Sequence, residues 1–231
     1  MREARDNPAS LSLDLLHDDL KPYVQDGPLG KMLQHPLVQE ICGIIPALVN
    51  ERLEAKRLRV DELEQAGEWA QAIWFYERPW RLAYLALWWD TGRIDLAALR
   101  ELLPSIWIDA EAPRHVMRTA LALFRATGFV TDIEDGGAWA LPKEPVTLYR
   151  GVGSQRAARG MSWTKAGGVA AFFARRYARA GRPGYIYETT VKPTAILGIF
   201  EGRGESEVVV NPRKLKDVHL IETITKGDTN E

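Results

Sequence analysis

The spacing of apolar residues changes along this chain, and that change constrains the fold more than any other feature. From about residue 34 to residue 127 the apolar residues recur every three or four positions, which is typical of amphipathic helices. After Gly128, short runs rich in valine, isoleucine and tyrosine are separated by proline and glycine, which is typical of strands. The sequence therefore predicts an α+β protein with a helical N-terminal part and a strand-rich C-terminal part.

The same pattern divides the chain into four segments. Residues 1–30 are polar and rich in proline and glycine, so we expect a loose N-terminal arm with one short helix near Leu13–Leu20. Residues 31–140 form the predicted helical domain and residues 141–225 the strand-rich domain. We expect residues 226–231 to be a disordered tail.

Proline, glycine and a capping residue predict where the helices begin and end. Pro46 marks a helix start or a kink, and a break between two helices is expected near Pro79. Asp95 is the predicted N-cap of a helix that Pro104 interrupts. Gly128 is the predicted stop of the last helix in this part.

The helical part is rich in tryptophan. Five of the eight tryptophans lie between Trp69 and Trp89, at spacings that fit helices. Such a cluster is expected to form a hydrophobic core, although the same residues could line a ligand cage. Both interpretations place the tryptophans together.

The strand-rich part contains one helix and several short strands. The stretch "FVTDIEDGGAWAL" predicts a hairpin with its turn at "EDGG". The stretch "GGVAAFFARRYARAG" predicts a helix with a core-facing stripe, formed by Val169, Phe172, Phe173 and Tyr177. Four arginines follow on that helix, and they form a solvated face or attract a pyrophosphate or an acidic partner: Arg175, Arg176, Arg179 and Arg182.

Composition excludes several classes of protein. The net charge is −1, from 30 Lys and Arg against 31 Asp and Glu, whereas general nucleic-acid binding requires a basic excess. No stretch approaches the roughly 20 apolar residues of a membrane span, and no apolar signal segment is visible near the N-terminus. The single cysteine, Cys42, precludes an internal disulfide and is expected to be buried. The four histidines lack metal-ligand spacing, so no metal is expected. Because no signal segment or membrane span is visible, we expect a cytoplasmic protein.

Three polar fragments lie at the ends of predicted strands. Arg150 closes the strand in "VTLYRG", and Ser162 and Thr164 are two residues apart in "GMSWT". Glu205 and Glu207 are also two residues apart, directly before three valines, and on a strand each such pair shares one face. An ionised carboxylate is costly to bury, so acids at the mouth of an apolar strand indicate a functional site.

Together these side chains suit a substrate with a pyrophosphate, a ribose and a cationic leaving group. A guanidinium binds phosphate through a bidentate pair of hydrogen bonds. A carboxylate accepts a hydrogen bond from a ribose hydroxyl and stabilises positive charge that develops at a sugar carbon. A second carboxylate can orient or deprotonate the nucleophile. NAD+ fits this description.

The three fragments resemble, in order and in context, the Arg-Ser-Glu class of mono-ADP-ribosyltransferases of bacteria and phages. The resemblance covers roughly residues 140–225. It implies a mixed, split β-sheet core, NAD+ as co-substrate and a protein as the acceptor of ADP-ribose. The Glu-x-Glu spacing of Glu205 and Glu207 goes with arginine acceptors in that class. Trp163 stands where the class has a middle hydroxyl residue, and we expect it to pack in the core.

The resemblance also implies a role for each residue of the first two fragments. Arg150 would contact an NAD+ phosphate and hold the site together, and Gly151 would offer its backbone to the nicotinamide amide. Ser162 would hydrogen-bond and orient the catalytic glutamate. Thr164 would support the nicotinamide side and cap the following helix.

The remaining roles fall on the acidic fragment and on three aromatic residues. Glu207 would be the catalytic glutamate, and Glu205 would face the acceptor. Phe200, in the turn before the acidic pair, would recognise the acceptor. Phe173 and Tyr177 are expected in the core, although either one could instead stack on nicotinamide.

Two other functions remain open at the level of sequence. One is a non-catalytic binding or inhibitory module that docks through the tryptophan-rich helices. The other is an ADP-ribosyltransferase that acts on nucleic acid or on a small molecule. An antitoxin and a host protein are the candidate partners, since the sequence does not separate a toxin, a phage-borne modifier and a defence protein.

Overall fold

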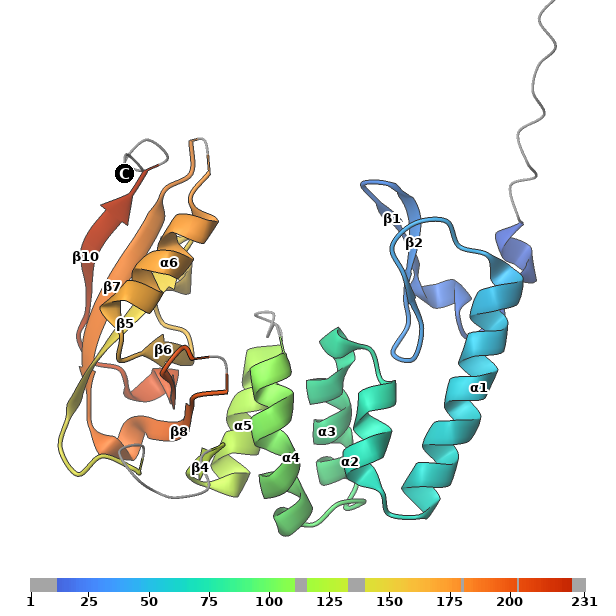
Figure 1. The fold of residues 1–231 in the computed structure, drawn as a ribbon, viewed down its shortest axis with the longest axis horizontal. Coiled ribbons are helices and arrows are strands. Elements are labelled where there is room, and N and C mark those ends of the chain that lie inside the picture. The colour runs from blue at the N-terminus through green and yellow to red at the C-terminus, as the bar shows by residue number, and fades with distance from the viewer. Residues whose placement is uncertain (1–11, 111–115, 133–139, 180, 203, 226–231) are drawn as a thin grey trace, which may run out of the picture. The chain divides into compact units, whose positions relative to one another are not determined.

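The computed structural model describes residues 12–110, 116–132, 140–179, 181–202 and 204–225. The chain forms two compact units, Met1–Ile94 and Asp95–Glu231 (Figure 1). The protein is α+β, and all seven strands of its larger sheet belong to the second unit. The boundary that the sequence suggested near residue 140 falls inside this second unit.

The described part of the first unit begins at residue 12 with ordered structure, where a loose arm was expected. Two 3-10 turns, Leu13–Leu15 and Lys21–Tyr23, lead into β1 Val24–Gly27, β2 Gly30–Gln34 and β3 Gln39–Glu40, an antiparallel sheet. Leu16 and Leu20 are buried, which anchors the segment. Residues 1–11 of the predicted arm lie outside the described residues. Within residues 12–30 the prediction is wrong, because Gly27 and Gly30 form a hairpin turn, in which Gly30 has a φ of 110°.

The rest of the first unit is helical. Its elements are α1 Pro46–Gln65, α2 Trp69–Ala72, the 3-10 turns Ile73–Phe75 and Arg78–Trp80, and α3 Arg81–Asp90. Pro46 is the first residue of α1, and the predicted break near Pro79 falls in a 3-10 turn. Helix was also expected before Pro46, but β3 lies there, and Cys42 is exposed instead of buried.

Two helices open the second unit. In α4 Leu96–Asp109 the Asp95 side chain accepts a hydrogen bond of 2.8 Å from Ala98 N, as expected of an N-cap. Pro104 does not interrupt α4, which continues to Asp109. Helix α5 Met117–Thr127 ends at Gly128, where a φ of 72° stops the helix as predicted.

A seven-stranded mixed sheet forms the core of the second unit, in the order β10-β7-β5-β6-β9-β8-β4. The strands are β4 Val130–Thr131, β5 Val146–Val152, β6 Ser162–Thr164, β7 Gly184–Val191, β8 Ile196–Phe200, β9 Glu207–Val210 and β10 Val218–Ile224. Strand β4 pairs in parallel with β8, whereas the other described pairs are antiparallel. The predicted hairpin at 129–141 falls partly on residues 133–139, outside the described residues, and its first strand is β4.

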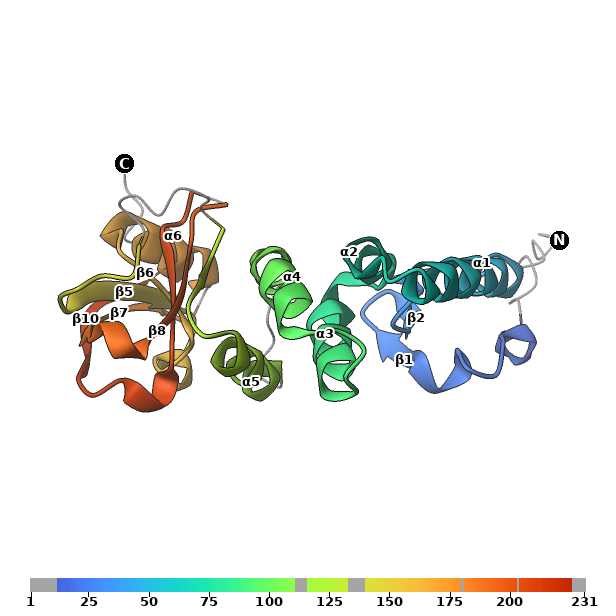
Figure 2. The ribbon, with the colours of Figure 1, turned by 90° about the horizontal axis from the view of Figure 1, so that it is seen from below.

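The sheet is weakly joined at its middle. Strands β5 and β6 share one registered pair, Tyr149 with Thr164, whereas β5 and β7 pair from Val146 to Val152. Helix α6 Gly167–Tyr177 lies over β5 and β7, as Figure 1 and Figure 2 show from two directions. Glu207 therefore belongs to one half of the sheet and Arg150 to the other.

The three valines that follow the acidic fragment form most of β9, a central strand of the sheet. Val208, Val209 and Val210 are fully buried, and β9 pairs with β6 on one side and with β8 on the other. A strand covered on both edges and both faces favours β-branched residues.

Among the described residues, no helix is long and apolar enough to cross a membrane.

Candidate functional site

The three polar fragments meet at one cavity. A cavity of about 620 Å³ lies in the second unit, at the junction of β5 and β6, with α6 on one side. It is lined by Arg150, Ser162, Thr164, Glu205 and Glu207, which come from segments up to 57 positions apart in the sequence. The cavity is within the range of about 300–1,000 Å³ that is typical of ligand sites.

Arg150 joins the two halves of the sheet. Its Nε donates to the Ala157 carbonyl oxygen at 3.1 Å, and its Nη1 donates to the Ser162 carbonyl oxygen. Gly160 lies so close that a Cβ there would be 2.3 Å from Nη2 of Arg150. The guanidinium thus holds the loop between β5 and β6 through main-chain acceptors while it lines the cavity.

Gly151 is required by the packing of α6. A Cβ on Gly151 would lie 1.9 Å from the carbonyl oxygen of Ala170 in α6, and one on Gly184 would lie 2.0 Å from the carbonyl oxygen of Ala174. The helix backbone therefore lies directly on the backbones of β5 and β7. This close approach explains Gly151 without the nicotinamide contact that the resemblance implies.

The packing of α6 also corrects the predicted stripe of core aromatics. Ala170 and Ala174 form the buried face, whereas Phe172 is 58% exposed and Tyr177 is 48% exposed. Only small residues fit where helix and sheet backbones touch, so the aromatic residues are displaced to other faces. Phe173 and Tyr177 are stacked, with centroids 6.4 Å apart, and both line the cavity.

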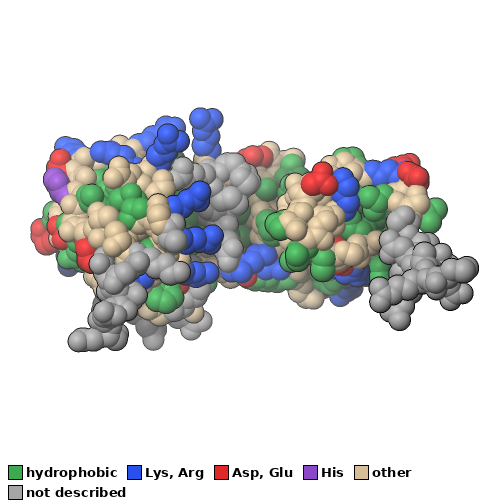
Figure 3. Space-filling model, turned by 90° about the horizontal axis from the view of Figure 1, so that it is seen from above, with side chains coloured by type: hydrophobic (Ala, Val, Ile, Leu, Met, Phe, Trp, Pro, Cys, Tyr) green, Lys and Arg blue, Asp and Glu red, His purple; other side chains and the backbone are tan. Residues whose placement is uncertain are grey.

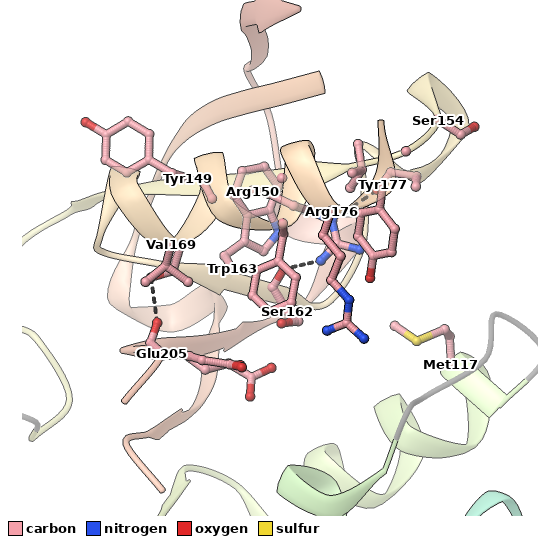
Figure 4. A pocket seen from close by; sticks show the side chains of 18 of the residues that line it. Met117, Tyr149, Arg150, Ser154, Ser162, Trp163, Val169, Arg176, Tyr177 and Glu205 are labelled. Carbon is pink, nitrogen blue, oxygen red and sulfur yellow. Dashed lines mark hydrogen bonds between the residues drawn. The ribbon is translucent and has the colours of Figure 1, made fainter. Parts of the chain in front are cut away.

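Figure 4 shows how α6 contributes to the cavity. Arg176 and Tyr177 project from the helix toward the side of the cavity on which Met117 of α5 lies. Four exposed arginines lie near this end of α6. Arg175 and Arg176 are in its last turn, whereas Arg179 and Arg182, which were expected on the helix, lie beyond its end at Tyr177. Basic side chains are prominent on the face of the second unit that Figure 3 shows. An anionic group is therefore electrostatically favoured near this end of α6.

Glu207 is the first residue of β9 and is only 6% exposed. The indole Nε1–H of Trp107 in α4 donates to its Oε1 at 3.1 Å. This donor was not predicted, because it lies outside residues 140–225 and is 100 positions away. In the sheet register Glu207 is opposite Thr164, and Ser162 is opposite Val209.

Thr164 connects β6 to the acidic fragment and to the start of α6. Its hydroxyl donates to the Glu205 carbonyl oxygen at 2.7 Å and accepts from Ala166 N at 3.0 Å. Because Ala166 is the N-cap residue of α6, Thr164 fixes the residue before the helix and does not cap its first turn. Trp163 is 2% exposed in the core, as expected of a packing residue.

The two glutamates do not sit on one strand. Strand β9 begins at Glu207, and Ser206 has a φ of 45°, in the left-handed region that non-glycine residues rarely adopt. A turn therefore positions Glu205, which is half-buried and still lines the cavity. Such backbone strain is concentrated at functional sites in proteins.

The turn before β9 is anchored from β4. The Asp132 carboxylate accepts hydrogen bonds from Glu201 N at 3.0 Å and from Gly202 N at 2.7 Å. Lys165 N donates to the Ser206 carbonyl oxygen at 3.3 Å, and burial lowers the pKa of the Lys165 side chain, against the influence of Glu201. The Asp132 side chain thus holds the chain at Glu201 and Gly202, and the Lys165 main chain holds it at Ser206.

Phe200 does not face the cavity. It is 2% exposed and packs on Phe124 of α5, with ring centroids 6.2 Å apart. Its predicted role in acceptor recognition is therefore wrong, because the ring points into the core. No group of three or more His, Cys, Asp or Glu side chains in the described segments could hold a metal ion.

Comparison of this chain with protein-family models, with curated proteins and with solved structures finds no match in any of the three.

Proposed function

We propose that this protein is a mono-ADP-ribosyltransferase that cleaves the nicotinamide–ribose bond of NAD+ and transfers ADP-ribose to a protein, with arginine as the favoured acceptor. The observation that carries the proposal is the convergence of Arg150, Ser162 and Glu207 on one cavity, with Glu207 almost fully buried. The three residues come from separate strands of the sheet.

Glu207 would stabilise the transition state. Cleavage of the bond between nicotinamide and C1′ of the ribose leaves positive charge on the sugar, and the electron pair of the bond leaves with neutral nicotinamide. A carboxylate acts more strongly on that charge in a water-excluded site than in bulk solvent. With 6% of its surface exposed, Glu207 meets this requirement.

Glu205 would serve the acceptor. A half-buried carboxylate at the same cavity can pair with an incoming guanidinium and accept the proton that its nitrogen loses when the N–C1′ bond forms. Because the chain turns at Ser206, Glu205 lines the same cavity as Glu207 although only Glu207 is in the buried strand.

The opposite side of the cavity suits the rest of NAD+. Phe173 and Tyr177 offer aromatic faces for a flat ring, and the exposed arginines near them offer a positive field for the pyrophosphate. Arg150 contributes charge to the same cavity while its main-chain bonds keep it in place.

The proposal is tested by incubating the protein with labelled NAD+ and a cell lysate. Wild-type protein should label a protein band and release nicotinamide, and Glu207→Gln should lower the rate about 100-fold or more, as the loss of a central electrostatic group does. Glu222→Gln, on the exposed face of β10, is the matched control and should retain full activity. Mass spectrometry of the labelled protein then identifies the acceptor side chain.

Three outcomes would overturn the proposal or part of it. Wild-type protein that neither binds NAD+ in calorimetry nor releases nicotinamide would remove the enzyme assignment and favour a binding module. Activity that survives Glu207→Gln unchanged would remove the assignment of the site. Label that resists protease and is lost on nuclease treatment would move the acceptor to nucleic acid.

A further inference from the structure

The hydrogen bond between Trp107 and Glu207 joins two parts of the second unit that are far apart in the sequence. Trp107 lies in α4 and Glu207 in β9, and the bond from Nε1 to Oε1 is 3.1 Å. Trp107 is 4% exposed and Glu207 is 6% exposed, so the bond is shielded from water. Both residues also line the cavity.

Such a bond restricts the carboxyl group. An indole has one N–H donor and no acceptor, so its orientation decides which atom it can hold. A hydrogen bond to an ionised acceptor is stronger than one between neutral groups, and it is stronger again at low dielectric. The bond therefore limits rotation of the Glu207 side chain and fixes the position of Oε1.

The indole is itself fixed by a chain of aromatic rings. Trp107 contacts Phe124 edge-on, with centroids 5.1 Å apart and an interplanar angle of 83°. Phe124 contacts Phe200 at 6.2 Å, and Phe200 is the registered partner of Glu207 across β8 and β9. The contacts thus form a closed loop from Glu207 through Trp107, Phe124 and Phe200 back to Glu207.

We propose that Trp107 is the positioning residue of Glu207, and that α4 and α5 are part of the catalytic machinery. This inference rests on the proposed function. It gives Phe200 a supporting role behind Trp107, in place of the acceptor contact that the resemblance implied. It also extends the functional unit to residues before position 140.

The test is the variant Trp107→Phe in the full chain. This change removes the N–H and keeps an aromatic ring against Phe124. We expect kcat for nicotinamide release to fall about 10-fold to 100-fold, the size of a lost hydrogen bond to a charged group, while KM for NAD+ changes less than about 2-fold. A role in packing alone would lower the folded fraction and leave kcat per folded molecule unchanged.

Trp88→Phe is the matched control. Trp88 is fully buried in the first unit, and within the described part of the chain its Nε1 has no hydrogen-bond partner. The same substitution there should leave kcat and KM at wild-type values. Phe124→Leu is a second variant, which loosens the ring that supports Trp107 and should give a smaller fall in kcat with the same unchanged KM.

Indole N–H signals in nuclear magnetic resonance spectra test the contact without any assay of activity. In Glu207→Gln the acceptor of Trp107 becomes neutral, so one indole signal should move upfield, and that signal should be absent from Trp107→Phe. If no indole signal responds to Glu207→Gln, the contact is refuted even when Trp107→Phe does not fold.

The outcomes separate the two claims. An active wild-type protein in which Trp107→Phe keeps its kcat overturns this inference alone. A wild-type protein that releases no nicotinamide overturns the proposed function and the catalytic part of this inference, even where the signal of Trp107 moves. A fall in kcat that only follows the folded fraction assigns Trp107 to packing and overturns the positioning role.

Discussion

The two units of this protein each contain a cluster of large aromatic side chains on helices, and the clusters differ in what their polar atoms do. In the first unit Trp88 packs against Trp69 and Tyr76, and the distances between ring centroids are 5.1 Å and 5.8 Å. In the second unit Trp107 packs on Phe124, and its indole N–H reaches a buried carboxylate. Both tryptophans pack edge-on against aromatic rings. The indole N–H of Trp107 donates to a carboxylate, whereas that of Trp88 has no hydrogen-bond partner in the described part of the chain.

The carboxylates that meet the two clusters also differ in setting. In the first unit Glu64 accepts a hydrogen bond of 3.2 Å from the Tyr76 hydroxyl and also binds the Arg93 guanidinium, so a cation pairs with its charge. In the second unit Glu207 lines a cavity. Glu64 is thus held within the first unit by a tyrosine and an arginine, whereas Glu207 accepts an indole N–H and lines a cavity.

The largest effect on stability is expected from Gly151→Ala, because the backbone of α6 packs directly against the backbone of β5 at this glycine. The new Cβ would lie 1.9 Å from a main-chain oxygen that cannot move alone. We expect a loss of unfolding free energy of about 3 kcal/mol or more, at the upper end of overpacking effects. Urea denaturation measures it.

Gly67→Ala is the control for this prediction in the first unit. Gly67 has a φ of 73°, and no atom lies within 4 Å of the Cβ position, so only backbone strain opposes the change. That strain should cost about 1 kcal/mol. Equal losses for the two variants would contradict the close packing of α6 on β5.

Local signals in the sequence predicted much of the second unit. The cap at Asp95, the stop at Gly128 and the buried strand at the valines are confirmed, as is the α+β class. Each depends on a few adjacent residues, whose chemistry determines their conformation. The mixed sheet is confirmed as well, whereas the enzymatic role of its residues stays a prediction.

The parts that failed depend on partners that are distant in the sequence. The aromatic residues of α6 were expected in the core because they outrank alanine in hydrophobicity, but Gly151 and Gly184 leave space only for small residues. The Trp107–Glu207 bond spans 100 positions, and no spacing rule reaches so far. Phe200 precedes the acidic fragment in sequence yet faces α5, because strand alternation turns it inward.

The second prediction concerns the pH dependence of the first unit. His35 is 7% exposed, and burial, with a contribution from Arg57, lowers its pKa from 6.5 to about 4. Its Nδ1 accepts a hydrogen bond of 3.1 Å from Leu37 N, which requires the unprotonated nitrogen. Below pH 6.5 the unfolded chain binds a proton that the folded chain does not, so the free energy of unfolding decreases as the pH is lowered.

The window of this effect runs from pH 6.5 down to about pH 4. Between pH 7 and pH 5 the loss from His35 should be about 2 kcal/mol, from the proton that only the unfolded chain binds. His35→Gln cannot titrate and should show a flatter stability profile over this range in urea denaturation. A profile as steep as that of the wild type would assign the acid sensitivity to other groups.

The smallest effect is expected from Tyr76→Phe, which removes the first unit's counterpart of the Trp107–Glu207 bond. The ring would keep its contacts with Trp88 and with Tyr84, whose centroid lies 3.9 Å away, and the substitution would delete one hydroxyl donor to Glu64. Because Glu64 keeps its pairing with Arg93, the loss should be about 1 kcal/mol. Nicotinamide release per folded molecule should stay at the wild-type rate, since this bond supports structure alone. A fall in that rate, with stability unchanged, would show that the first unit also acts on the chemistry and would end the contrast between the two clusters.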